Sequence, residues 1–85
     1  MLIEDVIGRV RTVLPDATIN VDGEGCSFTV TVVSERFEGM RPVARQQQLM
    51  AAFVDVLQSG QLHALSIRSW TPAELQVNQQ LVSLD

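Results

Sequence analysis

Residues 17–34 read ATINVDGEGCSFTVTVVS, and their pattern decides the fold. Apolar residues alternate with polar ones at 19–21, and the alternation resumes at 28–32 after the glycine-bearing segment 22–25. A period of two is typical of strands with one buried face, and DGEG is typical turn chemistry. The stretch therefore predicts two antiparallel strands joined by a loop at 22–25.

The segments before and after this stretch have the spacing of helices. Residues 3–14 place apolar side chains three and four positions apart, which predicts a helix that Pro15 helps to end. After a connector with a short helical turn at 35–37, Pro42 suits the first turn of a second helix and Gly60 suits its end. The predicted core face of this second helix consists of Leu49, Met50, Phe53, Val54 and Leu57.

The remaining segments predict a third strand and a final helix. Residues 62–70, LHALSIRSW, alternate in part. Thr71, Pro72 and Glu74 have the spacing of a capping box with proline at the first helical position, so a short helix should start there. The weak periodicity of residues 76–85 predicts a tail that frays.

The order helix, strand, strand, helix, strand, helix predicts a single α+β domain spanning residues 1–85. The expected architecture is a three-stranded mixed sheet with helices packed on one face. A helical crossover joins the second and third strands, so as neighbours they run parallel. No apolar run approaches the ~20 residues of a membrane span, and no leader pattern is visible, so a soluble, cytoplasmic protein without membrane contact is expected.

The predicted topology brings the one cysteine and the one histidine of the chain together. Cys26 lies just before the second strand and His63 at the start of the third, and parallel neighbours begin at the same end of a sheet. Taken singly, His63 could be an imidazole bonded to backbone and Cys26 a small buried apolar residue. Their convergence instead favours a pair of metal ligands, since imidazole and thiolate both bind iron, zinc or copper.

Cysteine usage and charge exclude several classes of function. One cysteine allows neither an intrachain disulfide nor a four-cysteine metal site within the chain. A Cys–His nucleophile would need an orienting third group and an oxyanion site, and neither is visible. Asp22 and Glu24 beside the thiol also oppose thiolate formation. We therefore predict no catalytic residues and no enzyme.

Nucleic-acid binding is the alternative function, and the charge of the chain disfavours it. The net charge is −4, and all six basic residues are arginines. A binder that tracks the phosphate backbone needs several cations, and Arg36, Arg41 and Arg45 are the candidates for such a patch. The other interpretation of these three arginines is an ordinary solvated surface.

The segment VVSERFEGMRPVARQQQLMAAFVDVLQSGQLHALSIRSWTPAEL resembles the BolA family, and it looks closest to the short bacterial IbaG-like branch. The most specific pieces are FEGM, HALSI and TPAEL, in that order, and the resemblance covers about residues 3–75. It implies a fold similar to type II KH domains. It also implies a non-enzymatic role in iron–sulfur trafficking or regulation, with links to transcription regulation and stress response.

The resemblance also implies a cofactor and a partner. Family members share a bridging [2Fe–2S] cluster with a monothiol glutaredoxin, which supplies its own cysteine and a glutathione thiolate. His63 matches the family's histidine ligand, and Cys26 in GCSF matches the cysteine-bearing variant of the second ligand. The isolated chain is expected to be apo, as a monomer or weak homodimer.

The chain departs from the family pattern in two places. Leu75 stands where the family often has tryptophan, and the segment after it is neutral to acidic rather than basic. GMRP is not the repeated-glycine loop of nucleic-acid-binding KH domains. The alternative, a KH-like transcription regulator that binds nucleic acid through Arg36, Arg41 and Arg45, is therefore less well supported. A plain interaction module without metal is a third possibility.

Overall fold

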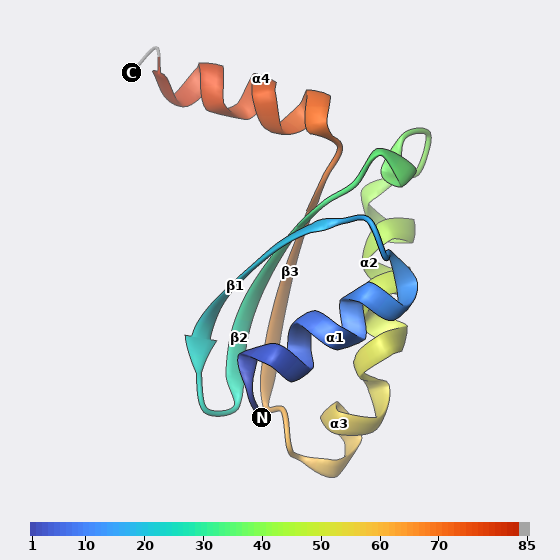
Figure 1. The fold of residues 1–85 in the computed structure, drawn as a ribbon, viewed down its shortest axis with the longest axis vertical. Helices are drawn as coiled ribbons and strands as arrows, with labels where there is room; N and C mark the ends of the chain where they lie inside the picture. Colours follow the sequence, from blue (N-terminus) through green and yellow to red (C-terminus); the bar gives the residue numbers. More distant parts are fainter. Residues whose placement is uncertain (84–85) are drawn as a thin grey trace.

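A computed structural model describes the backbone of residues 1–83 and the side chains of residues 1–77. It is an α+β fold whose sheet has the strand order β1–β2–β3 (Figure 1). The pair β1–β2 is antiparallel and the pair β2–β3 is parallel, as the sequence predicted. The elements are α1 (Ile3–Val13), β1 (Thr18–Glu24), β2 (Ser27–Val33), the 3-10 turn η1 (Glu35–Phe37), α2 (Pro42–Met50), the 3-10 turn η2 (Ala51–Phe53), α3 (Val54–Ser59), β3 (Ala64–Trp70) and α4 (Pro72–Ser83).

The loop between β1 and β2 is shorter than the predicted 22–25. Asp22, Gly23 and Glu24 belong to β1, and only Gly25 and Cys26 connect the strands. Glu24 pairs with Ser27, so the loop is a two-residue hairpin connection. Gly25 has a φ of 68° and Cys26 has no positive φ, the combination that a type II′ turn requires. Cys26 is thereby fixed in the tightest connection of the sheet.

The crossover between β2 and β3 is two α-helices with the 3-10 turn η2 between them, and this break corrects the predicted core face. A 3-10 residue advances about 120° around the axis where an α-helical residue advances about 100°. The three residues of η2 therefore change the direction in which the side chains of α3 point. Val54, predicted to be buried, is 46% exposed, whereas Val56 is 3% exposed and joins the core. Gly60 ends α3 with a φ of 85°, as predicted.

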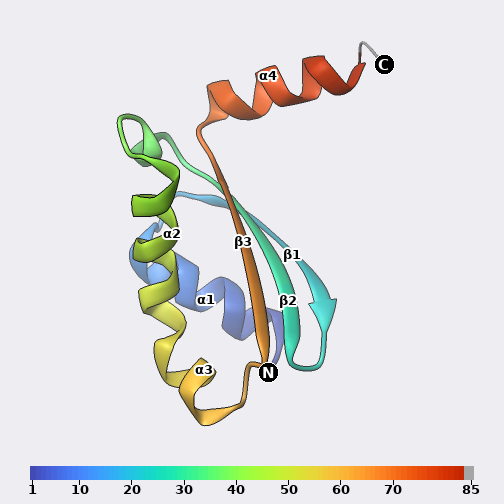
Figure 2. The ribbon, with the colours of Figure 1, turned by 180° about the vertical axis from the view of Figure 1, so that it is seen from behind.

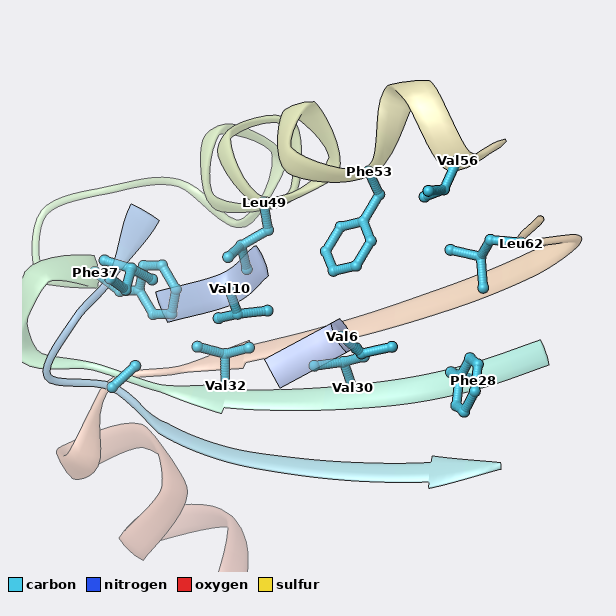
Figure 3. Packing of buried hydrophobic residues seen from close by; sticks show 12 residues of the cluster. Val6, Val10, Phe28, Val30, Val32, Phe37, Leu49, Phe53, Val56 and Leu62 are labelled. Atoms are coloured by element: carbon cyan, nitrogen blue, oxygen red, sulfur yellow. The ribbon is translucent and has the colours of Figure 1, made fainter. Parts of the chain in front are cut away.

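The core lies between the sheet and the helices α1 to α3 (Figure 3). Alternate residues of β2 face α1 and the crossover, which explains the period of two in the sequence. The buried apolar residues are Val6, Val10, Leu14, Ala17, Phe28, Val30, Val32, Phe37, Leu49, Phe53, Val56 and Leu62. Among the described residues, no helix has both the length and the hydropathy that crossing a bilayer requires.

The helix α4 extends away from the body of the domain, so only α1 to α3 cover the sheet (Figure 2). Its capping box is confirmed: the Thr71 hydroxyl accepts the Glu74 N–H at 3.2 Å, and the Glu74 carboxylate accepts the Thr71 N–H at 2.9 Å. The prediction of a short helix was wrong, because α4 continues to Ser83 through the segment predicted to fray. Residues 84–85 lie outside the described part of the chain.

Candidate functional site

Cys26 and His63 lie side by side at one end of the sheet. The parallel register pairs Ser27 with Ala64, which places Cys26 opposite His63 one step before the ladder begins. The carbonyl oxygen of Cys26 accepts two hydrogen bonds, from the backbone N–H of His63 at 2.7 Å and from that of Ala64 at 3.2 Å. The adjacency predicted from the topology is therefore present, and backbone hydrogen bonds hold it.

Both side chains are accessible, to different degrees. Cys26 is a free thiol, half-buried, and the His63 side chain is exposed. A cleft of about 760 Å³ opens beside Cys26, between α1 and the segment that leads into β3. Of the described residues, those that line it include Cys26, Gly8, Arg9 and Gln61, but not His63. The thiol thus borders a hollow while the imidazole lies on the outside of the same end.

The donor set of this pair fits part of an iron–sulfur site. Thiolate and imidazole both bind the irons of [2Fe–2S] clusters, whose two irons take four terminal ligands in all. Within residues 1–77, whose side chains are described, there is no group of three or more His, Cys, Asp or Glu side chains able to hold a metal ion. Cys26 and His63 could therefore provide two of the four ligands, and the others would have to come from another molecule.

The predicted arginine patch is not formed, because Arg45 is buried. The residue is 4% exposed, and its guanidinium donates to both carboxylate oxygens of Glu74, at 2.6 and 3.2 Å. It also donates to the Met40 carbonyl at 3.0 Å and lies 5.4 Å from the centroid of the Phe37 ring. A side chain with all these contacts is not available to phosphates. The prediction that Arg45 contributes to a nucleic-acid surface was wrong.

Arg36, in η1, and Arg41, just before α2, remain exposed. Both follow the far end of β2, whereas Cys26 and His63 precede the start of β2 and β3, so the arginines lie at the other end of the sheet. Arg36 lies 3.8 Å from the Asp16 carboxylate, and both side chains are largely in solvent. Such a pair contributes little to stability and leaves the guanidinium accessible. Two exposed arginines are a weaker anchor for phosphates than the predicted three.

Two ion pairs were not visible in the sequence. Arg9 of α1 donates to both oxygens of Asp55, at 2.7 and 3.0 Å, and to the Ala52 carbonyl at 2.8 Å. These hydrogen bonds lower the pKa of Asp55 and raise that of Arg9. The hydrogen bonds from Arg45, and then the N–H of Thr71, lower the pKa of Glu74 to about 2. Both ion pairs join segments that are distant in sequence, so no local sequence pattern predicts them. The only detectable signal was the Thr71–Glu74 cap, which involves one of the four residues.

Comparisons with known proteins agree on one family. The model of the family described as BolA-like protein matches residues 12–74. The acid stress protein IbaG of Escherichia coli K12 is 35% identical over 70 residues, covering 78% of this chain and 83% of the relative. A Vibrio cholerae protein named DNA-binding transcriptional regulator BolA is 46% identical over 59 residues, covering 68% of this chain and 55% of the relative.

Solved structures show the same fold. A BolA homologue from Coxiella burnetii superposes with a TM-score of 0.74 at 27% identity, covering 89% of this chain and 97% of the homologue. The BolA domain of Arabidopsis thaliana SufE1 has a TM-score of 0.69 at 32% identity, with 84% and 92% covered. Yeast Fra2 has a TM-score of 0.68 at 28% identity, with 88% and 84% covered.

Proposed function

Because the chain belongs to the BolA-like protein family, we propose that it is a non-enzymatic iron–sulfur trafficking or regulatory protein that acts with a monothiol glutaredoxin. In this proposal the two proteins share a bridging [2Fe–2S] cluster, with His63 and Cys26 as the ligands from this chain. The observation that carries it is that backbone hydrogen bonds hold Cys26 and His63 next to each other, with both residues accessible. The family resemblance supplies the cofactor and the kind of partner.

The two residues have different tasks in this role. Neutral imidazole from His63 adds no negative charge, and histidine ligation tends to raise the reduction potential of a [2Fe–2S] centre. Imidazole is also a protonatable ligand, so its bond to a metal is acid-labile. Cys26 binds as the thiolate, at the mouth of the cleft. A ligand pair with one labile member suits a cluster that is sensed or transferred rather than kept.

The test is to mix the apo chain with a cluster-loaded monothiol glutaredoxin and to record visible absorption and circular dichroism. The wild-type chain should change the spectrum, because a thiolate ligand is exchanged for imidazole. His63→Ala should abolish the changed form and Cys26→Ala should weaken it, seen as faster bleaching. Ser66→Ala, at an exposed position further along β3, is the matched control and should behave as wild type. An unchanged wild-type spectrum on mixing would overturn the assignment.

A DNA-binding regulator is the second candidate, since the relative from Vibrio cholerae carries that name. Of the three arginines predicted for this surface, only Arg36 and Arg41 are available, because Arg45 is paired with Glu74. The net charge of −4 opposes the approach of a polyanion. Of the two candidates, iron–sulfur trafficking or regulation with a protein partner is the better supported.

A further inference from the structure

The end of the molecule with Cys26 and His63 also exposes apolar side chains. Leu2 is 64% exposed and Ile3 is 43% exposed. Both line a groove of about 330 Å³ that they form against the β1–β2 hairpin, where Gly23 and Phe28 line the other side. Isolated exposed apolar residues are common, whereas neighbouring ones in a groove indicate a contact surface.

This groove adjoins the cleft beside Cys26. Met1 and Glu4 line both hollows, so the groove at the hairpin and the cleft at the thiol are neighbours. The terminal ammonium of Met1 donates to the carbonyl oxygen of Gly25 at 3.4 Å, which holds the first residues of the chain against the hairpin loop. Figures 1 and 2 both place the N-terminus beside the start of β3. We call the two adjoining hollows together the thiol-end surface.

The rim of the thiol-end surface is mainly acidic. Its exposed carboxylates come from the start of α1 and from the end of β1, namely Glu4, Asp5 and Glu24. The terminal ammonium of Met1 is a cation at this surface, and the arginine of the cleft, Arg9, is already paired with Asp55. The exposed Arg36 and Arg41 follow the far end of β2, at the opposite end of the sheet. The thiol end therefore carries a net negative charge around an apolar centre.

We propose that the thiol-end surface is the docking site of the protein that completes the ligand shell, and that this partner presents an apolar side chain inside a rim of lysine and arginine. The inference rests on the proposed function and names the chemistry of its partner. Leu2 and Ile3 lose their contact with water on docking, and the three carboxylates of the rim meet cations of the partner. Opposite potentials also steer the two proteins so that the partner's ligands arrive at Cys26 and His63.

The test measures the affinity of the apo chain for an apo monothiol glutaredoxin by calorimetry, so that cluster binding does not enter. Leu2→Ser and the double variant Glu4→Lys/Glu24→Lys should each weaken binding by about tenfold or more, as loss of an apolar anchor or reversal of complementary charge does. Val43→Ser and Glu38→Lys are the matched controls. They change an exposed valine and an exposed glutamate away from the thiol end, and their affinity should stay within about twofold of wild type.

Salt provides the second measurement. Wild-type affinity should fall as NaCl rises from about 50 to 300 mM, because interactions between exposed charges are screened beyond the Debye length. The milder variant Glu4→Gln/Glu24→Gln should bind more weakly than wild type and lose most of this salt dependence. This variant replaces the double lysine variant in the test if the charge reversal disturbs folding.

The outcomes separate this inference from the proposed function. If all the thiol-end variants bind as tightly as wild type, and wild-type binding does not depend on salt, the docking site is overturned. The cluster assignment would remain intact. A wild-type chain that neither binds the glutaredoxin nor changes its spectrum would overturn the proposed function, and the docking site with it. Self-association in sedimentation that Leu2→Ser removes would give the surface to a second copy of the chain and overturn the inference.

Discussion

Gly23 shows how one residue without a side chain can position a reactive one. It stands opposite Phe28 in the β1–β2 ladder with a φ of 115°, a conformation that L side chains rarely adopt. A Cβ at this position would lie 2.3 Å from the Ser27 carbonyl oxygen, which is backbone and cannot swing aside. The hairpin can close at Gly25 and Cys26 only because position 23 is glycine.

Gly23→Ala should therefore destabilise the domain and displace Cys26. Backbone strain of this kind costs about 1–3 kcal/mol of unfolding free energy, measured by urea denaturation. The matched control is Gly8→Ala, in the middle of α1 with nothing within 4 Å of a new Cβ. It should stabilise the domain by about 0.5–1 kcal/mol, since alanine is the better helix former. Equal effects of the two substitutions would contradict this account of the hairpin.

At the scale of elements, the turn η2 decides which residues of the crossover are buried. Sequence periodicity assumes one continuous helix, and on that assumption Val54 belongs to the core. The 3-10 geometry of Ala51–Phe53 rotates the last turns, so Val56 packs inward and Val54 faces solvent. A local break of this kind is set by how the crossover packs on α1 and the sheet, which no pattern within the segment records.

The pair Val56→Ala and Val54→Ala tests this rotation with identical chemistry at two positions. Val56→Ala should lower the unfolding free energy by about 1.5–2.5 kcal/mol, from lost burial and the cavity left behind. Val54→Ala should change it by no more than about 0.5 kcal/mol, as exposed substitutions do. Urea midpoints of the two variants give the comparison. The reverse order would mean that the crossover is a continuous helix after all.

The anchoring of α4 depends on a contact between elements. Glu74 closes the capping box of its own helix and at the same time binds Arg45 of α2. The cap was predictable because its residues are adjacent in sequence. Arg45 was predicted as a surface cation because arginine is seldom buried, and its partner lies outside its helix. The sequence thus predicts the local contact of Glu74, the cap with Thr71, and misses the tertiary contact with Arg45.

Acid should release this anchor. The pKa of Glu74 in the folded chain is about 2, below the ordinary 4.5, so its contribution to stability is complete above about pH 4.5 and disappears as pH falls toward 2. Urea midpoints of wild type and Glu74→Gln should differ at pH 7 and converge near pH 2. Glu38→Gln, an exposed carboxylate beside η1, is the control and should follow wild type over the whole range. A constant wild-type to Glu74→Gln difference from pH 7 to pH 2 would contradict the assignment.

Over the whole molecule, the two ends differ in the charges that they expose. The thiol end exposes carboxylates and, among the described residues, no arginine, whereas at the other end the exposed Arg36 and Arg41 are accompanied by the exposed Asp16, Glu35 and Glu38. Composition predicted the negative balance but not its distribution, because Arg9 and Arg45 are neutralised by partners distant in sequence. The topology, in contrast, was predictable. The order of helix-like and strand-like periodicity along the chain determines which strands run parallel. That is why the adjacency of Cys26 and His63 could be inferred while the shape of the cleft could not.

The charge distribution predicts that the chain binds duplex DNA weakly. At about 150 mM salt its dissociation constant should be above ~10⁻⁴ M, the weak limit of ordinary non-specific binding. Fluorescence anisotropy over a salt series measures this, with Arg36→Gln/Arg41→Gln as the variant that should abolish any residual binding. Micromolar affinity with a steep salt dependence that this double variant removes would favour the DNA-binding regulator instead.

The two hydrogen bonds on the Cys26 carbonyl have a consequence for the life of the chain. During synthesis the hairpin with Cys26 is made well before β3. A nascent or truncated chain therefore contains the Cys26 thiol without the His63 imidazole. Only when β3 has docked along β2 does the imidazole arrive. If the pair binds iron as proposed, the chain can supply both ligands only after β3 has been synthesised and has docked.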